Sequence, residues 1–359
     1  MQIRWLVLAA VAAFAPPAVA QEQKYRVGVV SESGDIVTWL KPVGATLVVD
    51  RVVPVGIMPA DIDGPHNITV APDMKSYFIT IAHGVPFGTL WRLDAETDTL
   101  IGKATVELFP TTIAITPDGE FAFVANSDFH GDRPRVNVVS IVHVPTMAKI
   151  TDLPACDMPH GVKVNHAGTF AYVSCMNSDE ILEVDIGTFA ITRRAKIGTG
   201  HSMTKMAADP GHAMGKECAG TFVSVSADDT TLYVACNYGN TVQVWDAASL
   251  TQAKEIPVGG GAYNVEPSPD GSVAIVTNKK DQSFSIIDLK TLTEAIRIKT
   301  TKKIVHGIAF SPDGKYAYVT QESIGSDPGA IDVVDLAARK VTSSIAIPAQ
   351  PTGITILKQ

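Results

Sequence analysis

The sequence predicts an all-β protein, a seven-bladed β-propeller of four-stranded antiparallel blades whose first blade is closed by the C-terminal strand. Three observations predict this fold: a hairpin motif recurs along the chain, the opening unit lacks its first strand, and the last residues match only that missing strand. Because a repeat at a regular spacing determines the whole architecture, the hairpin motif is the first element to establish.

The clearest copy of the motif is VHGIAFSPDGKYAYVT, residues 305–320. Ile308 and Phe310 alternate with smaller or polar neighbours, as a half-buried strand requires. Residues 311–314 read Ser-Pro-Asp-Gly, in which Pro presets φ, Asp bonds its own backbone and Gly accepts a positive φ. The alternation resumes at Tyr316, so the stretch is predicted to be a β-hairpin.

Five further copies of this hairpin precede it, and each copy is followed by a third and a fourth alternating strand. The spacing is about 42 to 49 residues, with one longer interval after the copy at position 159. The sequence therefore contains six complete four-strand units. Their hairpins begin at Pro65, Pro110, Pro159, Gly220, Ala262 and Val305.

The two ends of the chain complete a seventh unit. Residues 25–56 read as three strands without a leading one, and the C-terminal PTGITILKQ matches only the first strand of the motif. We expect Ile354 to Leu357 to supply the missing innermost strand of the first unit. Such a ring leaves only short, protected sheet edges.

The N-terminus reads as a cleaved signal peptide, residues 1–20, before a single propeller domain at 21–359. Arg4 precedes an apolar run, and Ala18-Val19-Ala20 offers a small-residue cleavage site. No later apolar run approaches the ~20 residues of a transmembrane helix, so no membrane span is expected. The short apolar run favours export to a bacterial periplasm.

The charge balance and the missing motifs exclude several classes of protein. Residues 21–359 carry 28 Lys and Arg against 37 Asp and Glu, a net charge of −9. This balance argues against nucleic-acid binding, which relies on cations that neutralise phosphates, and it offers no polybasic membrane signal. The chain has no C-x-x-C, C-x-x-C-H, G-x-G-x-x-G or Walker lysine motif. Covalent haem and the common nucleotide sites are thereby excluded.

Three of the hairpins resemble a known group of repeats. They read TPDGEFAFVAN at 116–126, SPDGSVAIVTN at 268–278 and SPDGKYAYVT at 311–320. They are similar to the YVTN repeat family of β-propellers. Its superfamily includes the heavy chain of methylamine dehydrogenase and the haem-binding propeller of cytochrome-type nitrite reductase. The resemblance covers nearly all of residues 21–359. It implies the fold and leaves the function open, because propellers host enzymes, cofactor carriers and binding platforms.

Candidate site residues lie at the start of each first strand, where the chain meets the mouth of the central channel. Every one of these seven positions is polar, and three are histidines on blades 2, 4 and 7. Neutral imidazoles spaced around a narrow opening suit one shared Zn, Cu or Fe ion. The alternative is that polar and aromatic side chains simply fill the mouth. The positions are His66, Thr111, His160, Thr221, Tyr263, His306 and Thr352.

Other histidines are secondary candidates or surface residues. His83 and His130 follow second strands and are expected on the same face as the three histidines. The stretch with Asp128, His130 and Asp132 has no evident nucleophile, so it is interpreted as an exposed loop. His143, in a third strand, and His166, in a turn at the opposite end, are expected on the surface.

The long interval between repeats carries an unusual insertion, IGTGHSMTKMAADPGHAMGKECAG, residues 197–220. It contains two H-x-M pairs, and imidazole with thioether suits soft Cu(I). The alternative is a flexible insertion whose methionines cap the mouth hydrophobically. The candidate ligands are His201, Met203, His212 and Met214.

The four cysteines map to the same face as the three histidines. Cys156 and Cys218 precede first strands, while Cys175 and Cys236 end the second strands of the same blades. Because these strands are antiparallel neighbours, the pairs Cys156–Cys175 and Cys218–Cys236 would each staple one blade, as suits an oxidising compartment. Thiolate metal ligation and pairing across blades remain as alternatives.

Three hypotheses for function follow from these residues. The first is an exported propeller that binds a small ligand or a metal ion, copper foremost, at the channel mouth, with the H-x-M loop as a lid or delivery site. The second is an oxidoreductase with redox-active copper or a non-covalent haem, which the resemblance to the nitrite-reductase propeller implies. The third is a metal-free platform for another periplasmic protein.

Overall fold

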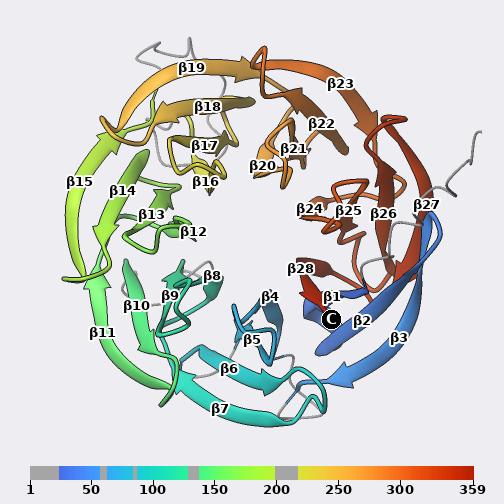
Figure 1. The fold of residues 1–359 in the computed structure, drawn as a ribbon, viewed down its shortest axis with the longest axis horizontal. Helices are drawn as coiled ribbons and strands as arrows, with labels where there is room; N and C mark the ends of the chain where they lie inside the picture. The colour runs from blue at the N-terminus through green and yellow to red at the C-terminus, as the bar shows by residue number, and fades with distance from the viewer. Residues whose placement is uncertain (1–23, 57–62, 84–86, 128–136, 199–216) are drawn as a thin grey trace, which may run out of the picture.

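The computed structural model describes residues 24–56, 63–83, 87–127, 137–198 and 217–359. Within these ranges the chain forms seven four-stranded antiparallel sheets arranged around a central axis, with the first strand of each blade innermost (Figure 1). The predicted seven-bladed propeller is confirmed. Blades 2 to 4 are β4 (Pro65–Val70), β5 (Ser76–Ile81), β6 (Thr89–Asp94) and β7 (Leu100–Thr105); β8 (Pro110–Ile115), β9 (Phe121–Asn126), β10 (Val138–His143) and β11 (Ala148–Pro154); and β12 (Pro159–Val164), β13 (Phe170–Cys175), β14 (Glu180–Asp185) and β15 (Ala190–Lys196).

The remaining complete blades follow the same order from the channel outward. Blades 5 to 7 are β16 (Gly220–Val225), β17 (Thr231–Cys236), β18 (Thr241–Asp246) and β19 (Thr251–Pro257); β20 (Ala262–Pro267), β21 (Val273–Asn278), β22 (Ser283–Asp288) and β23 (Thr293–Lys299); and β24 (Val305–Phe310), β25 (Tyr316–Gln321), β26 (Gly329–Asp335) and β27 (Lys340–Ile347).

Blade 1 joins the two ends of the chain. It consists of β28 (Pro351–Lys358), β1 (Tyr25–Ser31), β2 (Ile36–Val43) and β3 (Thr46–Pro54), in that order from the channel. The pairing of β28 with β1 places Val27 opposite Ile356, and Figure 1 shows the two ends of the colour range side by side. The C-terminal strand therefore closes the ring as predicted.

The same backbone link recurs in all seven blades at the end where the first strands begin. The residue just before each first strand is left-handed, and its carbonyl accepts a hydrogen bond from the amide just after the second strand, as from Glu322 to Ile304 at 2.9 Å. A positive φ disfavours most side chains, yet only two of the seven are glycine. These left-handed residues are Gly64, Phe109, Met158, Ala219, Gly261, Ile304 and Gln350.

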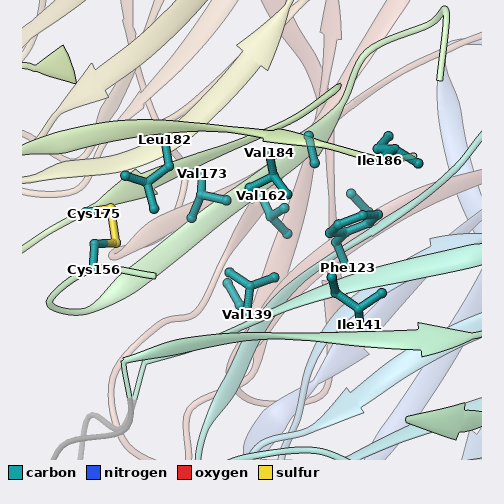
Figure 2. Close-up of a cluster of buried hydrophobic side chains, with 13 residues drawn as sticks. Phe123, Val139, Ile141, Cys156, Val162, Val173, Cys175, Leu182, Val184 and Ile186 are labelled. Atoms are coloured by element: carbon teal, nitrogen blue, oxygen red, sulfur yellow. A yellow bond between two sulfur atoms is a disulfide. The ribbon is translucent and has the colours of Figure 1, made fainter. Parts of the chain in front are cut away.

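The core lies between neighbouring blades. Figure 2 shows one such layer, in which Phe123, Val139 and Ile141 of blade 3 face Val162 and Val184 of blade 4. These side chains alternate along their strands with residues that face the next layer, as the period of two requires. Each blade therefore buries apolar surface on both faces, which holds the ring together.

Both predicted disulfides are present within their blades. Cys156 pairs with Cys175 in blade 4 and Cys218 with Cys236 in blade 5, with Cα–Cα distances of 6.0 and 4.4 Å. Disulfides persist in oxidising compartments, so the two bonds indicate an extracytoplasmic location. In the ranges that the structure describes, no helix is both long enough and apolar enough to cross a membrane.

Candidate functional site

The three predicted histidines meet at one end of the channel, where first strands begin and second strands end. We call this the imidazole end and define it by His66, His83, His160, Tyr263 and His306. His66, His160 and His306 come from β4, β12 and β24 and are 7%, 0% and 2% exposed. These imidazoles are thus buried rather than solvated.

A carboxylate that the sequence analysis missed holds two of the imidazoles. Glu32 directly follows β1, and its Oε2 lies 2.6 Å from Nδ1 of His66 while its Oε1 lies 2.7 Å from Nε2 of His83. Burial by itself would raise the pKa of Glu32, but the charges and hydrogen bonds of the two histidines lower it to about 2. An ionised Glu32 accepts a hydrogen bond from His66 Nδ1–H, so His66 Nε2 is the ring nitrogen that does not face the carboxylate.

His160 has both ring nitrogens engaged. Its Nδ1 donates to the Thr221 carbonyl at 2.8 Å, and its Nε2 lies 3.2 Å from the Tyr263 hydroxyl. Burial, with a further contribution from the charge of His66, lowers the pKa of His160 to about 3. The ring is therefore neutral at physiological pH, with a fixed tautomer.

His306 is buried without a hydrogen bond on either ring nitrogen, and His66 Nε2 is in the same condition. The Glu322 carboxylate is 3.9 Å from His306 Nε2, and the backbone of Thr352 acts on the ring by raising its pKa against the effect of burial. Burial, followed by the charge of Lys279, lowers the pKa of His306 well below its usual value. The His66 and His306 ring centroids are 5.4 Å apart. Two adjacent imidazoles thus carry buried nitrogens without a close hydrogen-bond partner among the described residues.

Tyr263 stands between His160 and His306. Its ring centroid lies 5.5 Å from that of His160 and 4.8 Å from that of His306. Lys279 Nζ sits 3.8 Å from the Tyr263 ring centroid and 2.8 Å from Glu322 Oε1, so the cation is shared by an aromatic face and a carboxylate. Burial, then the charges of Glu322 and Glu32, raises the pKa of the Tyr263 hydroxyl, which stays protonated.

The three predicted threonines contribute to the scaffold. Thr111 Oγ1 donates to the His160 carbonyl at 3.0 Å, Thr352 Oγ1 to the His66 carbonyl at 2.7 Å, and Thr221 Oγ1 to the Tyr263 carbonyl. Each hydroxyl joins the inner strand of one blade to that of the next. These bonds hold in place the backbone that carries the histidines.

Several predicted residues lie elsewhere. His201, Met203, His212 and Met214 of the insertion, together with Asp128, His130 and Asp132, fall outside the described residues. His143 Nδ1 lies 2.7 Å from Thr146 Oγ1 in an exposed pair, and His166 Nδ1 lies 2.8 Å from Asp229 Oδ1 at the opposite end of the channel.

One alignment of the sequence would have found the missed charges. The residue directly after each second strand is equivalent in all seven blades, and it faces the imidazole end. Glu32, Lys279 and Glu322 occupy this position in blades 1, 6 and 7. The full set is Glu32, Ala82, Ser127, Met176, Asn237, Lys279 and Glu322.

The other half of the channel is open. A cavity of about 590 Å³ is lined by the inner strands of all seven blades and by the turns that follow some of them. Phe222 lines this cavity, and its ring also contacts those of His160 and Tyr263 at 5.2 and 5.4 Å between centroids. Phe222 therefore contacts both the cavity and the imidazole end.

The spacing of the donors limits how a metal ion is held. Among the described residues, no three His, Cys, Asp or Glu side chains are grouped closely enough to hold one ion. The available pair is His66 with His306, since His160 is committed to Thr221 and Tyr263. A single ion shared by all three predicted histidines would require side chains to move.

These features define an extracytoplasmic β-propeller with a buried imidazole cluster at one end of its channel. The family model described as YNCE-like beta-propeller matches residues 8–359, so the chain belongs to this family. The repeat resemblance seen in the sequence agrees with that membership.

Solved structures with the same fold are distant in sequence. Hydrazine synthase of Kuenenia stuttgartiensis is 20% identical with a TM-score of 0.67, over 84% of this chain and 92% of that chain. A functionally unknown protein from Desulfotomaculum acetoxidans DSM 771 is 12% identical with a TM-score of 0.73, over 93% and 99%. The dihydro-heme d1 dehydrogenase NirN in complex with DHE is 15% identical with a TM-score of 0.60, over 95% and 77%. These similarities establish the fold alone.

Proposed function

We propose that the protein is an exported, periplasmic binding propeller, with residues 1–20 removed as a signal peptide, and that it holds a metal ion, copper foremost, at the imidazole end. The observation that carries this proposal is the pair of buried imidazoles with unsatisfied nitrogens, His66 Nε2 and both nitrogens of His306. Buried polar atoms are nearly always hydrogen-bonded, and an unmet one points to an absent ion, water or ligand.

The surroundings of His66 support a metal ligand. Metal-binding histidines usually donate their second N–H to a carboxylate, which fixes the tautomer and raises the basicity of the ligating nitrogen. Glu32 stands in that relation to His66, at 2.6 Å from Nδ1. Glu32 is itself fixed by His83 at 2.7 Å. His66 Nε2 is therefore the nitrogen left to bind a metal ion, and the His306 ring lies 5.4 Å away between centroids.

Copper is favoured over harder ions by the donor set. Imidazole ligands suit Cu, Zn or Fe rather than Mg or Ca, which prefer oxygen ligands. Cu(I) tolerates a low number of ligands, whereas structural Zn sites take four. With two imidazoles that each have a ring nitrogen without a hydrogen bond, the copper alternative needs the fewest additional donors.

The haem alternative fits these side chains less well. The rings of His160, Phe222, Tyr263 and His306 contact one another at centroid distances of 4.8 to 6.4 Å. A haem macrocycle does not fit between rings at these separations. The third alternative, a metal-free interaction platform, leaves the buried nitrogens without an explanation.

Metal analysis of protein isolated from the periplasm tests the proposal. We expect about one copper per chain in the wild type after Cu(I) loading and a clear loss in His306→Phe, which keeps the ring packing against Tyr263. His166→Ala, at the exposed His166–Asp229 pair, serves as the matched control and should retain the metal. Equal copper in His306→Phe and wild type, or no copper in a folded wild type, contradicts the site.

A further inference from the structure

The open half of the channel has a chemistry of its own, separate from the imidazole end. Its 590 Å³ lies within the ~300–1,000 Å³ typical of small-molecule sites. Most of the lining is aliphatic or neutral and polar, with Asn67, Thr69, Asn264 and Thr355 offering amides and hydroxyls. Phe222 forms the floor, and turns after the inner strands form the rim.

Two charges of opposite sign stand inside this cavity. Lys163 Nζ lies 2.8 Å from Glu266 Oε1, and the two side chains are 34% and 29% exposed. They come from blades 4 and 6, so the pair spans the inner strand of blade 5 between them. Among the described residues that line the cavity, these are the charged side chains, with His166 at the rim.

Of the two charged side chains, the Glu266 carboxylate is contacted by a serine hydroxyl of the strand between them. Ser224 of β16 lies 2.8 Å from Glu266 Oε2 and 2.6 Å from the Val265 carbonyl, so it fixes the carboxylate end. Lys163, in contrast, reaches the pair only through its Nζ, which donates to Glu266 Oε1 at 2.8 Å. The carboxylate is positioned by the scaffold, and the ammonium reaches it across a flexible stem.

Opening this pair costs little free energy. A partly exposed ion pair contributes ~0–1 kcal/mol, because water solvates both ends once they separate. A ligand that carries both charges restores both interactions, whereas a simple anion or cation leaves one partner exposed. Because the two charges are equal and opposite, the pair does not favour anions over cations or cations over anions.

We propose that this cavity binds a small zwitterion of the α-amino-acid class, whose ammonium pairs with Glu266 and whose carboxylate pairs with Lys163. Both groups of such a ligand sit on one carbon, so they reach the two neighbouring side chains together. The neutral amides and hydroxyls of the walls face the ligand's side chain. The site is independent of the copper proposal, since the residues that line the cavity do not include His66 or His306.

Calorimetric titration of the full protein with L-glutamine tests the proposal. Propionate, propylammonium and erythritol serve as probes with one charge of either sign or none. We expect L-glutamine to bind and the three single-function probes to bind at least about tenfold more weakly. Lys163→Met and Glu266→Gln should each weaken L-glutamine binding about tenfold or more, while Lys196→Met, at the Lys196–Glu180 ion pair outside the cavity, leaves it unchanged.

The exchanged double variant Lys163→Glu/Glu266→Lys sharpens the test. It keeps one charge of each sign, so L-glutamine should still bind within about threefold of wild type in the reversed orientation. Failure of L-glutamine to bind folded wild type at millimolar concentration overturns the proposal. Propionate binding as tightly as L-glutamine, or wild-type affinity in both single variants, overturns it equally.

Discussion

The two ends of the channel are built from the same seven inner strands, yet they differ in packing and in polarity. At the imidazole end, a Cβ on Gly307 would lie 2.5 Å from the Thr352 carbonyl, and one on Gly161 would lie 2.7 Å from that of Thr221. In the open half of the channel, Gly314 has open space around it, and the Lys163–Glu266 pair faces a cavity. The imidazole end holds buried rings, while the open half of the channel holds a partly exposed ion pair.

This difference teaches how a repeated hairpin acquires function. The strands and turns repeat in every blade because each must pack on its neighbours. The residues at the start of each first strand and directly after each second strand differ from blade to blade, since they face the channel. A few substitutions at those positions create a site without altering the scaffold.

The largest expected effect comes from the disulfides, which lie at the imidazole end. Replacing Cys218 and Cys236 together with Ala removes a bond that closes 18 residues, and we expect a loss of about 3 kcal/mol in the free energy of unfolding. Chemical denaturation of the oxidised proteins measures it. An unchanged denaturation midpoint would show that the disulfide does not stabilise the imidazole end.

The second effect is a dependence of stability on pH in the metal-free protein. The pKa of His160 is about 3 when folded and 6.5 in the unfolded reference. The unfolded state therefore binds more protons below pH 6.5, so stability is complete above that pH and is lost as pH falls toward 3. We expect roughly 1 kcal/mol per pH unit from this residue.

Replacing His160 with Phe isolates that dependence. The slope of unfolding free energy against pH between 6.5 and about 4.5 should decrease by roughly 1 kcal/mol per unit in His160→Phe. The control is His166→Ala in the open half of the channel, where the imidazole is exposed beside Asp229. A wild-type slope in His160→Phe would contradict a buried, neutral His160.

The third effect compares two glycines of one hairpin. Gly307→Ala forces a Cβ against the backbone of β28 and should destabilise by about 2 kcal/mol through overpacking. Gly314→Ala, at φ +68° in open space, should cost about 1 kcal/mol from its left-handed backbone. Thermal unfolding ranks the two variants. The reverse order would mean that the inner strands are looser than their contacts indicate.

The smallest effect is expected at the open end. Lys163→Met removes a partly exposed ion pair, so the free energy of unfolding should fall by no more than about 1 kcal/mol. A loss above 2 kcal/mol, roughly beyond the range of exposed pairs, would make Lys163–Glu266 a structural clamp instead of an exchangeable pair.

The fold could be predicted from the sequence because its repeat is local. The Ser-Pro-Asp-Gly turn and the alternation around Ile308 specify one hairpin, and the unmatched ends specify closure through β28. The disulfide pairing followed from the same register, since Cys156 and Cys175 end antiparallel neighbours.

The site could be predicted only in part. Alignment of first strands found His66, His160 and His306, whereas Glu32 follows a second strand, a position that an alignment of first strands does not compare. The roles of Thr111 and Thr352 depend on the distance between neighbouring blades, which no single hairpin encodes. Hydrogen-bond partners across blades required the assembled ring.

The most direct test of the central proposal is the nitrogen NMR of the histidine side chains, recorded before and after Cu(I) addition. We expect His66 to carry its proton on Nδ1 in the metal-free protein, as the 2.6 Å contact with Glu32 requires. Cu(I) should then shift His66 Nε2 and one nitrogen of His306, and leave His166 unchanged. Signals of His66 and His306 that do not move at one equivalent of Cu(I) would contradict a copper site at the imidazole end.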